Sequence, residues 1–226
     1  MAAKLSKKEL KQPDAFQSTM ELIMNYIAEN KTRFYAIVTA VILSVVITFG
    51  IYMYWSYYQS SALDMYAKAR NDMARNIGNP DAAKINIKIF RELIAKYPHS
   101  WSARISHYHL GNLYYSIGEL NDAITEYKKF VSSSRADKVG IKFLALTSLG
   151  YCHEAKKDYQ VALEYYKKAQ KSDSVGFESI GFRNIARAYE ALNDKKNALE
   201  NYKNALQKTT DPSITVFIKR KISFLN

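Results

Sequence analysis

The longest apolar stretch of the chain runs from Phe34 to Trp55 and reads FYAIVTAVILSVVITFGIYMYW. It contains no charged residue and no proline, and as an α-helix it would extend about 33 Å, close to the roughly 30 Å hydrocarbon core of a bilayer. Aromatic residues that favour the membrane interface stand at both ends. The pattern predicts a transmembrane helix over residues 34–55. A cleaved signal peptide is disfavoured, because its apolar core is usually about 7–15 residues long and small residues follow it.

Small residues recur every fourth position within this stretch and would form one stripe along the helix. Such a stripe lets a second transmembrane helix approach closely. We therefore predict a packing surface for a membrane partner, formed by Ala36, Ala40, Ser44 and Thr48.

Residues 1–33 predict a cytoplasmic tail. Lysines concentrate near the start of the chain, Lys31 and Arg33 directly precede the span, and no further Lys or Arg occurs before Lys68. This asymmetry places the N-terminus in the cytoplasm and the larger part of the chain on the opposite side. A short amphipathic helix that starts near Pro13 and Asp14 is expected to lie on the membrane surface or to dock on a partner. An ordinary frayed helix explains its apolar stripe equally well, formed by Phe16, Met20, Ile23, Met24 and Ile27.

Beyond residue 56 a pattern of two helices recurs. Copies begin near residues 104, 143 and 179, and a degenerate copy begins near 67 with its inter-helix turn at Asn79-Pro80-Asp81. Self-similarity at this period is typical of the tetratricopeptide repeat. The matched positions are Leu110, Gly111, Tyr114, Ala123, Tyr127 and Phe130, then Leu149, Gly150, His153, Ala162, Tyr166 and Ala169, and finally Ile185, Ala186, Tyr189, Ala198, Tyr202 and Ala205.

The fold class that follows is all-α: a transmembrane helix, and then a right-handed solenoid of about four helical hairpins over residues 56–226. Small residues let paired helices touch and aromatic residues fill the gaps between pairs. Segments 132–138 and 171–179, rich in Ser and charge, lengthen the turns between copies. A capping helix over 213–226 would cover the last hairpin with Ile214, Phe217, Ile218, Ile222 and Leu225, leaving Lys219, Arg220 and Lys221 exposed.

The first helix of each pair is expected to line the concave surface of the solenoid. Tyrosine and arginine, which are enriched at binding hot spots, occupy most of the positions that should face this groove. We predict that partners bind there, through Tyr108, Asn112, Tyr115, Tyr151, Arg183 and Arg187.

The chain is basic, with 33 Lys and Arg against 21 Asp and Glu. Without the six basic and four acidic residues of positions 1–55, 27 basic and 17 acidic residues remain, so the distal part carries +10 of the total +12. Such a charge suits acidic partners or anionic lipids. The sequence contains no nucleic-acid reader motif, and the anchor argues against that class of partner.

Candidate chemistry is sparse. His107 and His109 lie two apart on a predicted helix and point to different faces, and the sequence contains no HExxH, CxxC, phosphate-binding loop or nucleophile elbow. We expect His107 to pack in the core or at its edge, Cys152 to be an inert buried thiol, and the acidic residues to lie on helix exteriors. The sequence predicts a protein that is not an enzyme and that uses no cofactor, metal or small-molecule substrate.

A short basic tail containing LKQPDAFQ, one span and about four repeat units resemble the YfgM-type family of bacterial inner-membrane proteins. The resemblance implies a periplasmic repeat domain that associates with the Sec translocon and with a membrane-anchored chaperone of the PpiD type, and that assists newly exported proteins. Members of that family are often acidic, whereas this domain carries +10, a difference that bears on the surface offered to partners.

The leading hypothesis is therefore a single-span scaffold that binds protein partners on the periplasmic side of the inner membrane. One alternative is a mitochondrial outer-membrane import receptor with cytosolic repeats. Receptors of that class that recruit chaperones use a carboxylate clamp of Lys and Asn; Asn112 matches one clamp position, but Tyr108 and Ile180 stand where lysines are expected. A cell-envelope assembly scaffold is the other alternative, and its anatomy would be identical.

Overall fold

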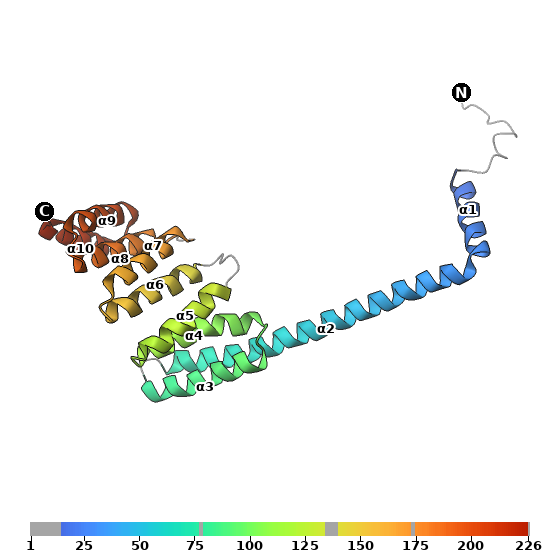
Figure 1. Ribbon diagram of the computed structural model, residues 1–226, viewed down its shortest axis with the longest axis horizontal. Helices are drawn as coiled ribbons and strands as arrows, with labels where there is room; N and C mark the ends of the chain where they lie inside the picture. Colours follow the sequence, from blue (N-terminus) through green and yellow to red (C-terminus); the bar gives the residue numbers. More distant parts are fainter. Residues whose placement is uncertain (1–14, 77–78, 134–139, 173–174, 226) are drawn as a thin grey trace, which may run out of the picture. The chain divides into compact units, whose positions relative to one another are not determined.

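The computed structural model describes residues 15–76, 79–133, 140–172 and 175–225, which form ten α-helices and no strand (Figure 1). Residues 1–14, which include the helix start expected at Pro13 and Asp14, lie outside the described residues, as do residues 134–138 and 173–174 of the two expected insertions. Contacts divide the chain into two units, Met1–Tyr57 and Tyr58–Asn226. In chain order the helices are α1 Ala15–Glu29, α2 Lys31–Arg75, α3 Pro80–Lys96, α4 Trp101–Ser116, α5 Leu120–Ser133, α6 Ile141–Ala155, α7 Tyr159–Lys171, α8 Glu178–Ala191, α9 Lys195–Lys208 and α10 Pro212–Leu225.

The first unit contains α1 and most of the apolar part of α2. The expected stripe of α1 is solvent-accessible, from Phe16 at 70 % exposure to the more covered Ile27. Within the described residues, α2 is the one helix long and apolar enough to cross a membrane, a statement that rests on length and composition alone. None of its most apolar 18-residue segment is buried within the chain. No other part of the described protein therefore packs over these side chains.

In the second unit each of the three complete hairpins is closed by a tyrosine that packs against a small residue of the partner helix. A Cβ atom added to Gly111 of α4 would lie 2.5 Å from the Tyr127 ring of α5. Gly150 of α6 meets Tyr166 of α7 in the same way, and Ala186 of α8 shares a core cluster with Tyr202 of α9. All three tyrosines are at most 1 % exposed. The repeat pattern therefore marks the closest contacts of the hairpins, and the expected tetratricopeptide-like solenoid is confirmed.

The hairpin turns share one backbone conformation. In the three complete pairs a residue with positive φ follows the first helix: Gly118 at 81°, Lys157 at 63° and Asn193 at 60°. The next N–H then donates to a carbonyl five residues back, as in the Schellman ending of a helix. These hydrogen bonds are Glu119 N–H to Tyr114 O at 2.9 Å, Asp158 N–H to His153 O at 2.8 Å and Asp194 N–H to Tyr189 O at 2.9 Å. Each first helix thus ends at the same repeat position.

The degenerate first hairpin is completed by the distal end of α2. The Tyr66 ring packs against Phe90 of α3 and Trp101 of α4, with ring centroids 6.3 and 5.9 Å apart. Asn79 caps α3 by accepting hydrogen bonds from the N–H groups of Asp81 and Ala82, at the turn that the sequence predicts. The boundary expected at residue 56 falls inside α2, which is continuous through that point; by contacts, the second unit begins at Tyr58.

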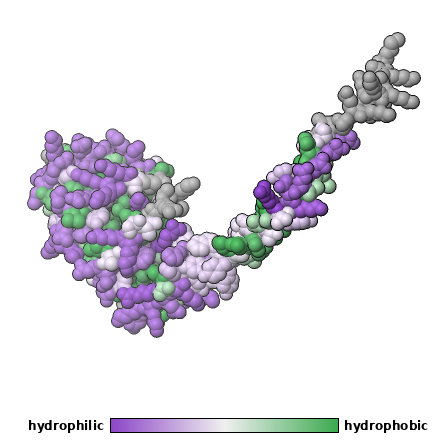
Figure 2. Space-filling model, turned by 45° about the vertical axis from the view of Figure 1, so that its right-hand side comes forward, coloured by the Kyte–Doolittle hydropathy of each residue, from purple (hydrophilic) through white to green (hydrophobic). Residues whose placement is uncertain are grey.

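The last hairpin is covered by α10, as expected. Ile218 is fully buried in a cluster with Tyr202 and Ala205. Phe217, expected on the covered side, is 45 % exposed, and Lys221, expected to be exposed, is half-buried in an ion pair. Figure 2 shows that the side of the repeat helices in view is mostly hydrophilic, with hydrophobic residues scattered over it.

Replacing Gly111 by Ala should destabilise the repeat unit, because the new methyl group would force α4 and α5 apart. Overpacking of this kind usually costs about 1–3 kcal/mol, and the better helix propensity of Ala, about 1 kcal/mol, offsets only part of it. Urea denaturation followed by circular dichroism measures the loss. Gly50→Ala is the matched control, because a Cβ at Gly50 meets nothing within 4 Å; equal stability of the two variants would contradict the packing account.

The unit should also lose stability in mild acid through His109. Burial and then the charge of Arg70 lower the pKa of His109 to about 4 from an ordinary 6.5; its Nε2 lies 2.8 Å from the Tyr66 hydroxyl, and its Nδ1 has no hydrogen-bond partner among the described residues. In the unfolded chain His109 is therefore protonated as pH falls below about 6.5, whereas in the folded chain it stays neutral until the pH falls towards 4. Over this window the lost stability is about 3 kcal/mol.

This prediction is checked by chemical denaturation between pH 7 and pH 4. His109→Gln should flatten the pH dependence, whereas His99→Gln should keep it, because His99 is exposed. An identical slope in wild type and His109→Gln would show that another group governs the acid response.

Candidate functional site

A half-buried ion pair joins the first helices of two consecutive hairpins. Arg187 on α8 donates from Nε and Nη2 to the two carboxylate oxygens of Glu154 on α6, both at 2.8 Å. The Tyr166 hydroxyl donates to the same carboxylate at 2.5 Å. The guanidinium also lies over the Tyr151 ring, 5.3 Å from its centroid. Because the contacts are bidentate and enclosed by rings, the orientation of Arg187 is fixed.

These neighbours set the charge of each group. Burial raises the pKa of Glu154, but the hydrogen bonds from Arg187 and Tyr166 and the charge of Arg187 outweigh it and hold the pKa below its ordinary value. Burial lowers the pKa of Arg187, and the Glu154 carboxylate more than reverses this. Burial and the same carboxylate raise the pKa of Tyr166. At neutral pH the cluster therefore holds a carboxylate, a guanidinium and a neutral phenol that donates.

The same arrangement recurs one hairpin later. The Tyr202 hydroxyl donates to Glu190 at 2.5 Å, and Lys221 of α10 donates to both oxygens of Glu190, at 3.0 and 3.1 Å. Glu154 and Glu190 both follow the aligned Leu149 and Ile185 by five residues. In the first complete hairpin this position is Tyr115, and the Tyr127 hydroxyl donates instead to Asn112 Oδ1, at 2.7 Å.

Sequence reasoning missed these carboxylates, because it placed acidic residues on helix exteriors. A third exception is Glu126, which is 8 % exposed and lies 2.6 Å from His107 Nδ1. The available signal was the repeat frame itself: in two copies a Glu stands five residues after the aligned aliphatic residue and twelve before the buried tyrosine.

Two cavities open along the first helices. The first, of about 380 Å³, is bordered by α4, α6, the start of α7 and α8. Its polar lining is mostly phenolic, and Tyr115 is 41 % exposed. The lining residues are Tyr115, Tyr151, Glu154, Ala155, Tyr159 and Arg187.

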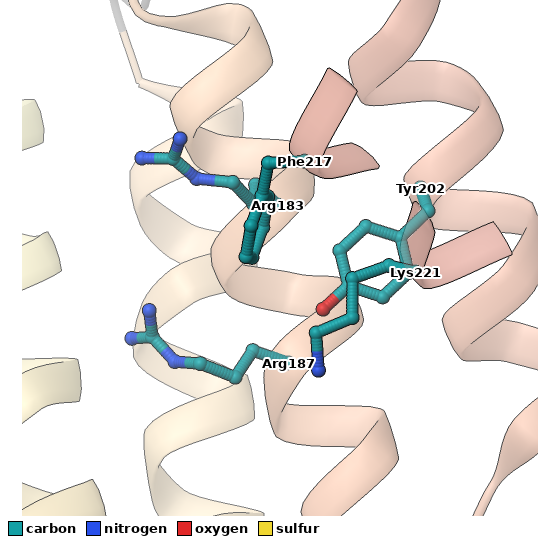
Figure 3. Close-up of a pocket in the computed structure, with 5 residues that line it drawn as sticks. All are labelled: Arg183, Arg187, Tyr202, Phe217 and Lys221. Carbon is teal, nitrogen blue, oxygen red and sulfur yellow. The ribbon is translucent and has the colours of Figure 1, made fainter. Parts of the chain in front are cut away.

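The second cavity, of about 400 Å³, lies between α8, α9 and α10 and is lined by Arg183, Arg187, Tyr202, Phe217 and Lys221. In Figure 3 the two arginine side chains extend from α8 in the same direction, and the Phe217 ring overlaps the stem of Arg183 in this view. Arg187 borders both cavities, so together they form one surface, which we call the first-helix surface.

Four of the six predicted groove residues border this surface: Tyr115, Tyr151, Arg183 and Arg187. Tyr151 is held there by Asn184, whose amide nitrogen donates to the Tyr151 hydroxyl at 3.1 Å. The other two take part in packing between helices. Tyr108 lies against Tyr127 and Phe130, with centroids 6.1 and 5.8 Å apart, and Asn112 accepts from Tyr127. Sequence reasoning did not single out Tyr159, which lines the first cavity.

The predicted transmembrane stripe lies in α2 with all four residues exposed, namely Ala36, Ala40, Ser44 and Thr48. The Thr48 hydroxyl donates to the Ser44 carbonyl at 2.8 Å. This hydrogen bond satisfies the hydroxyl within its own helix, which is the usual way for such a group to tolerate an apolar solvent.

The residues that could support covalent or metal chemistry are dispersed. Among the described residues, no group of three or more His, Cys, Asp or Glu could hold a metal ion. Burial raises the pKa of the Cys152 thiol to about 11, so it remains protonated and a poor nucleophile at neutral pH. What the first-helix surface can do, on its geometry, is bind through phenol and guanidinium groups held in place.

Solved structures similar to this chain include repeat proteins of several kinds. The chain matches MamA with a TM-score of 0.54 at 20 % identity, over 67 % of this chain and 79 % of that one. It matches Pseudomonas aeruginosa pilF at 0.56 and 18 %, over 74 % and 68 %, and BtubC from P. vanneervenii at 0.57 and 13 %, over 75 % and 82 %. At these identities the likeness concerns the fold alone. A search of curated proteins found no match.

Family assignment rests on a longer match. The model of the tetratricopeptide repeat-like domain matches residues 30–226. The matched region includes the apolar stretch of α2 and every described helix after it. The three complete hairpins, each closed by a buried tyrosine, are the physical counterpart of that match. The chain belongs to the tetratricopeptide repeat-like domain family.

Proposed function

We propose that this protein is a membrane-tethered scaffold that binds protein partners through its first-helix surface, on the periplasmic face of the bacterial inner membrane. Repeat solenoids of this kind generally act by presenting an extended binding surface. The resemblance to the YfgM-type family supports a role beside the Sec translocon and a PpiD-type chaperone. The observation that carries the proposal is the first cavity, where one exposed and two half-buried phenol groups line the same space as a fixed guanidinium.

Partner binding is supported by the restraint of the side chains on this surface in the unbound protein. Tyr151 is restrained by Asn184 and Arg187, and Arg187 by Glu154. Rigid aromatic groups lose little conformational entropy on binding, and Tyr and Arg are the residues most often found at hot spots. Tyr115 and Tyr159, from the neighbouring helices α4 and α7, extend this surface along the hairpins.

Membrane tethering is supported by α2. Its apolar window leaves all side chains unburied, an arrangement that water opposes and lipid favours. The family match begins at residue 30, just before this window. The basic residues that precede the window support a cytoplasmic N-terminus and therefore a periplasmic repeat unit.

The binding surface can be mapped with a photo-reactive amino acid inserted at single positions in cells that express the full chain. Insertion at Tyr115 or Tyr159 should give crosslinks to partner proteins, because both side chains border the first cavity. Insertion at Lys203, an exposed residue of the second helix α9, serves as the control and should give few. Crosslinks from Lys203 and none from the cavity positions would assign binding to the opposite surface.

The topology is tested by labelling engineered cysteines with a membrane-impermeant maleimide. The native Cys152 is fully buried and should contribute little background. In spheroplasts, Lys203→Cys should react, whereas Gln17→Cys should react only after lysis. The reverse pattern would place the repeat unit in the cytoplasm and exclude the periplasmic role.

A further inference from the structure

We infer that the second cavity, between α8 and α10, is a subsite for an acidic side chain of a bound protein segment, flanked by an apolar side chain of the same segment. This inference rests on the proposed function, because it names the chemistry that the first-helix surface recognises. Three features of the cavity support this inference: its net charge, the lack of an ion pair between Arg183 and any described carboxylate, and the exposure of Phe217.

The charge balance leaves one positive charge uncompensated. Three cations line the cavity: Arg183, Arg187 and Lys221. Two carboxylates are paired with them, Glu154 with Arg187 and Glu190 with Lys221. Three positive and two negative charges leave a net charge of +1. One further carboxylate therefore brings the cavity to neutrality, whereas a doubly charged phosphate would leave it negative.

Arg183 is the cation available to that carboxylate. Among the described residues, no carboxylate forms an ion pair with it, while the two other cations are each held by a Glu. Its side chain is half-buried on α8, one helical turn before Arg187, and extends in the same direction (Figure 3). A guanidinium presents parallel N–H donors that match both oxygens of a carboxylate.

The apolar part of the subsite is Phe217. It is 45 % exposed, although the neighbouring Ile218 of the same helix is fully buried. It lines the same cavity as Arg183 (Figure 3). In an extended segment, side chains two residues apart project to the same face, roughly 7 Å from each other. A segment with an acidic and a bulky apolar residue at that spacing can place one against Arg183 and the other on Phe217.

The test uses the full chain in detergent micelles and a fluorescent, end-capped peptide of Gly and Ser with a single Glu and a single Phe two positions apart. Capped ends exclude a terminal carboxylate as the ligand. At low salt, fluorescence anisotropy should show binding, and replacing the Glu of the peptide by Gln should weaken it about tenfold, because a charge-assisted hydrogen bond is lost.

Variants of the protein then identify the site. Arg183→Ala should weaken binding of the Glu peptide about tenfold and abolish the preference for Glu over Gln. Arg183→Lys should restore part of that preference, and Phe217→Ala should weaken both peptides to a similar extent. Lys219→Ala is the matched control: it removes one positive charge from an exposed position of the same helix α10 and should change binding less than twofold. Circular dichroism verifies that each variant folds.

An equal affinity for the Glu and Gln peptides, or an equal effect of Arg183→Ala and Lys219→Ala, would overturn the subsite. So would displacement of the Glu peptide by inorganic phosphate at a concentration at which acetate has no effect. If Tyr115 still crosslinks to protein partners in that case, the scaffold function stands without the acidic subsite. If those crosslinks are absent too, the proposed function fails together with it.

Discussion

The repeat unit depends on one steric constraint, the contact of a tyrosine ring with the backbone of the helix that faces it. Gly111 and Gly150 leave no side chain between the helices, and the rings of Tyr127 and Tyr166 occupy the space that a Cβ would take. Each of these rings is buried, yet each keeps its hydroxyl in a hydrogen bond. A single residue therefore supplies the apolar packing inside a hairpin and a polar contact at its edge.

That polar contact determines what kind of surface the solenoid presents. At the second and third complete hairpins the tyrosine hydroxyl meets a carboxylate, which in turn attracts a cation from the following helix. In the first complete hairpin the partner is the neutral Asn112. The first-helix surface therefore changes in character from phenolic near Tyr115 to charged near Arg183. Breaking one member of a half-buried pair leaves the other charge uncompensated, so these residues stabilise the unit and also form part of the surface proposed for binding.

Much of this fold could be predicted because its strongest constraints are local and periodic. A small residue before a turn and an aromatic residue after it recur in register, and the helices, the turn at Asn79 and the capping helix follow from that pattern. The ion pair between Glu154 and Arg187 could not be read in the same way, because its members are 33 residues apart and acidic residues are usually solvated. Tyr108 illustrates the limit on the candidate site. Helical spacing put it on the groove side, but only the position of α5 decides that its ring lies against Tyr127 and Phe130.

The pairing of Glu190 with Lys221 has a consequence for how such an array changes length over evolutionary time. The second and third complete hairpins each pair a glutamate with a cation from the next hairpin or from the capping helix, so the hairpins are not interchangeable. A gene duplication that copies a glutamate-bearing hairpin yields a paired, half-buried carboxylate only if the helix placed after it also brings a Lys or Arg to the matching position. Loss of α10 would remove Lys221 and leave the Glu190 carboxylate bonded to Tyr202 without a cation. Adding or removing a hairpin at the phenolic end, where Tyr127 bonds the neutral Asn112, would leave no carboxylate without a cation.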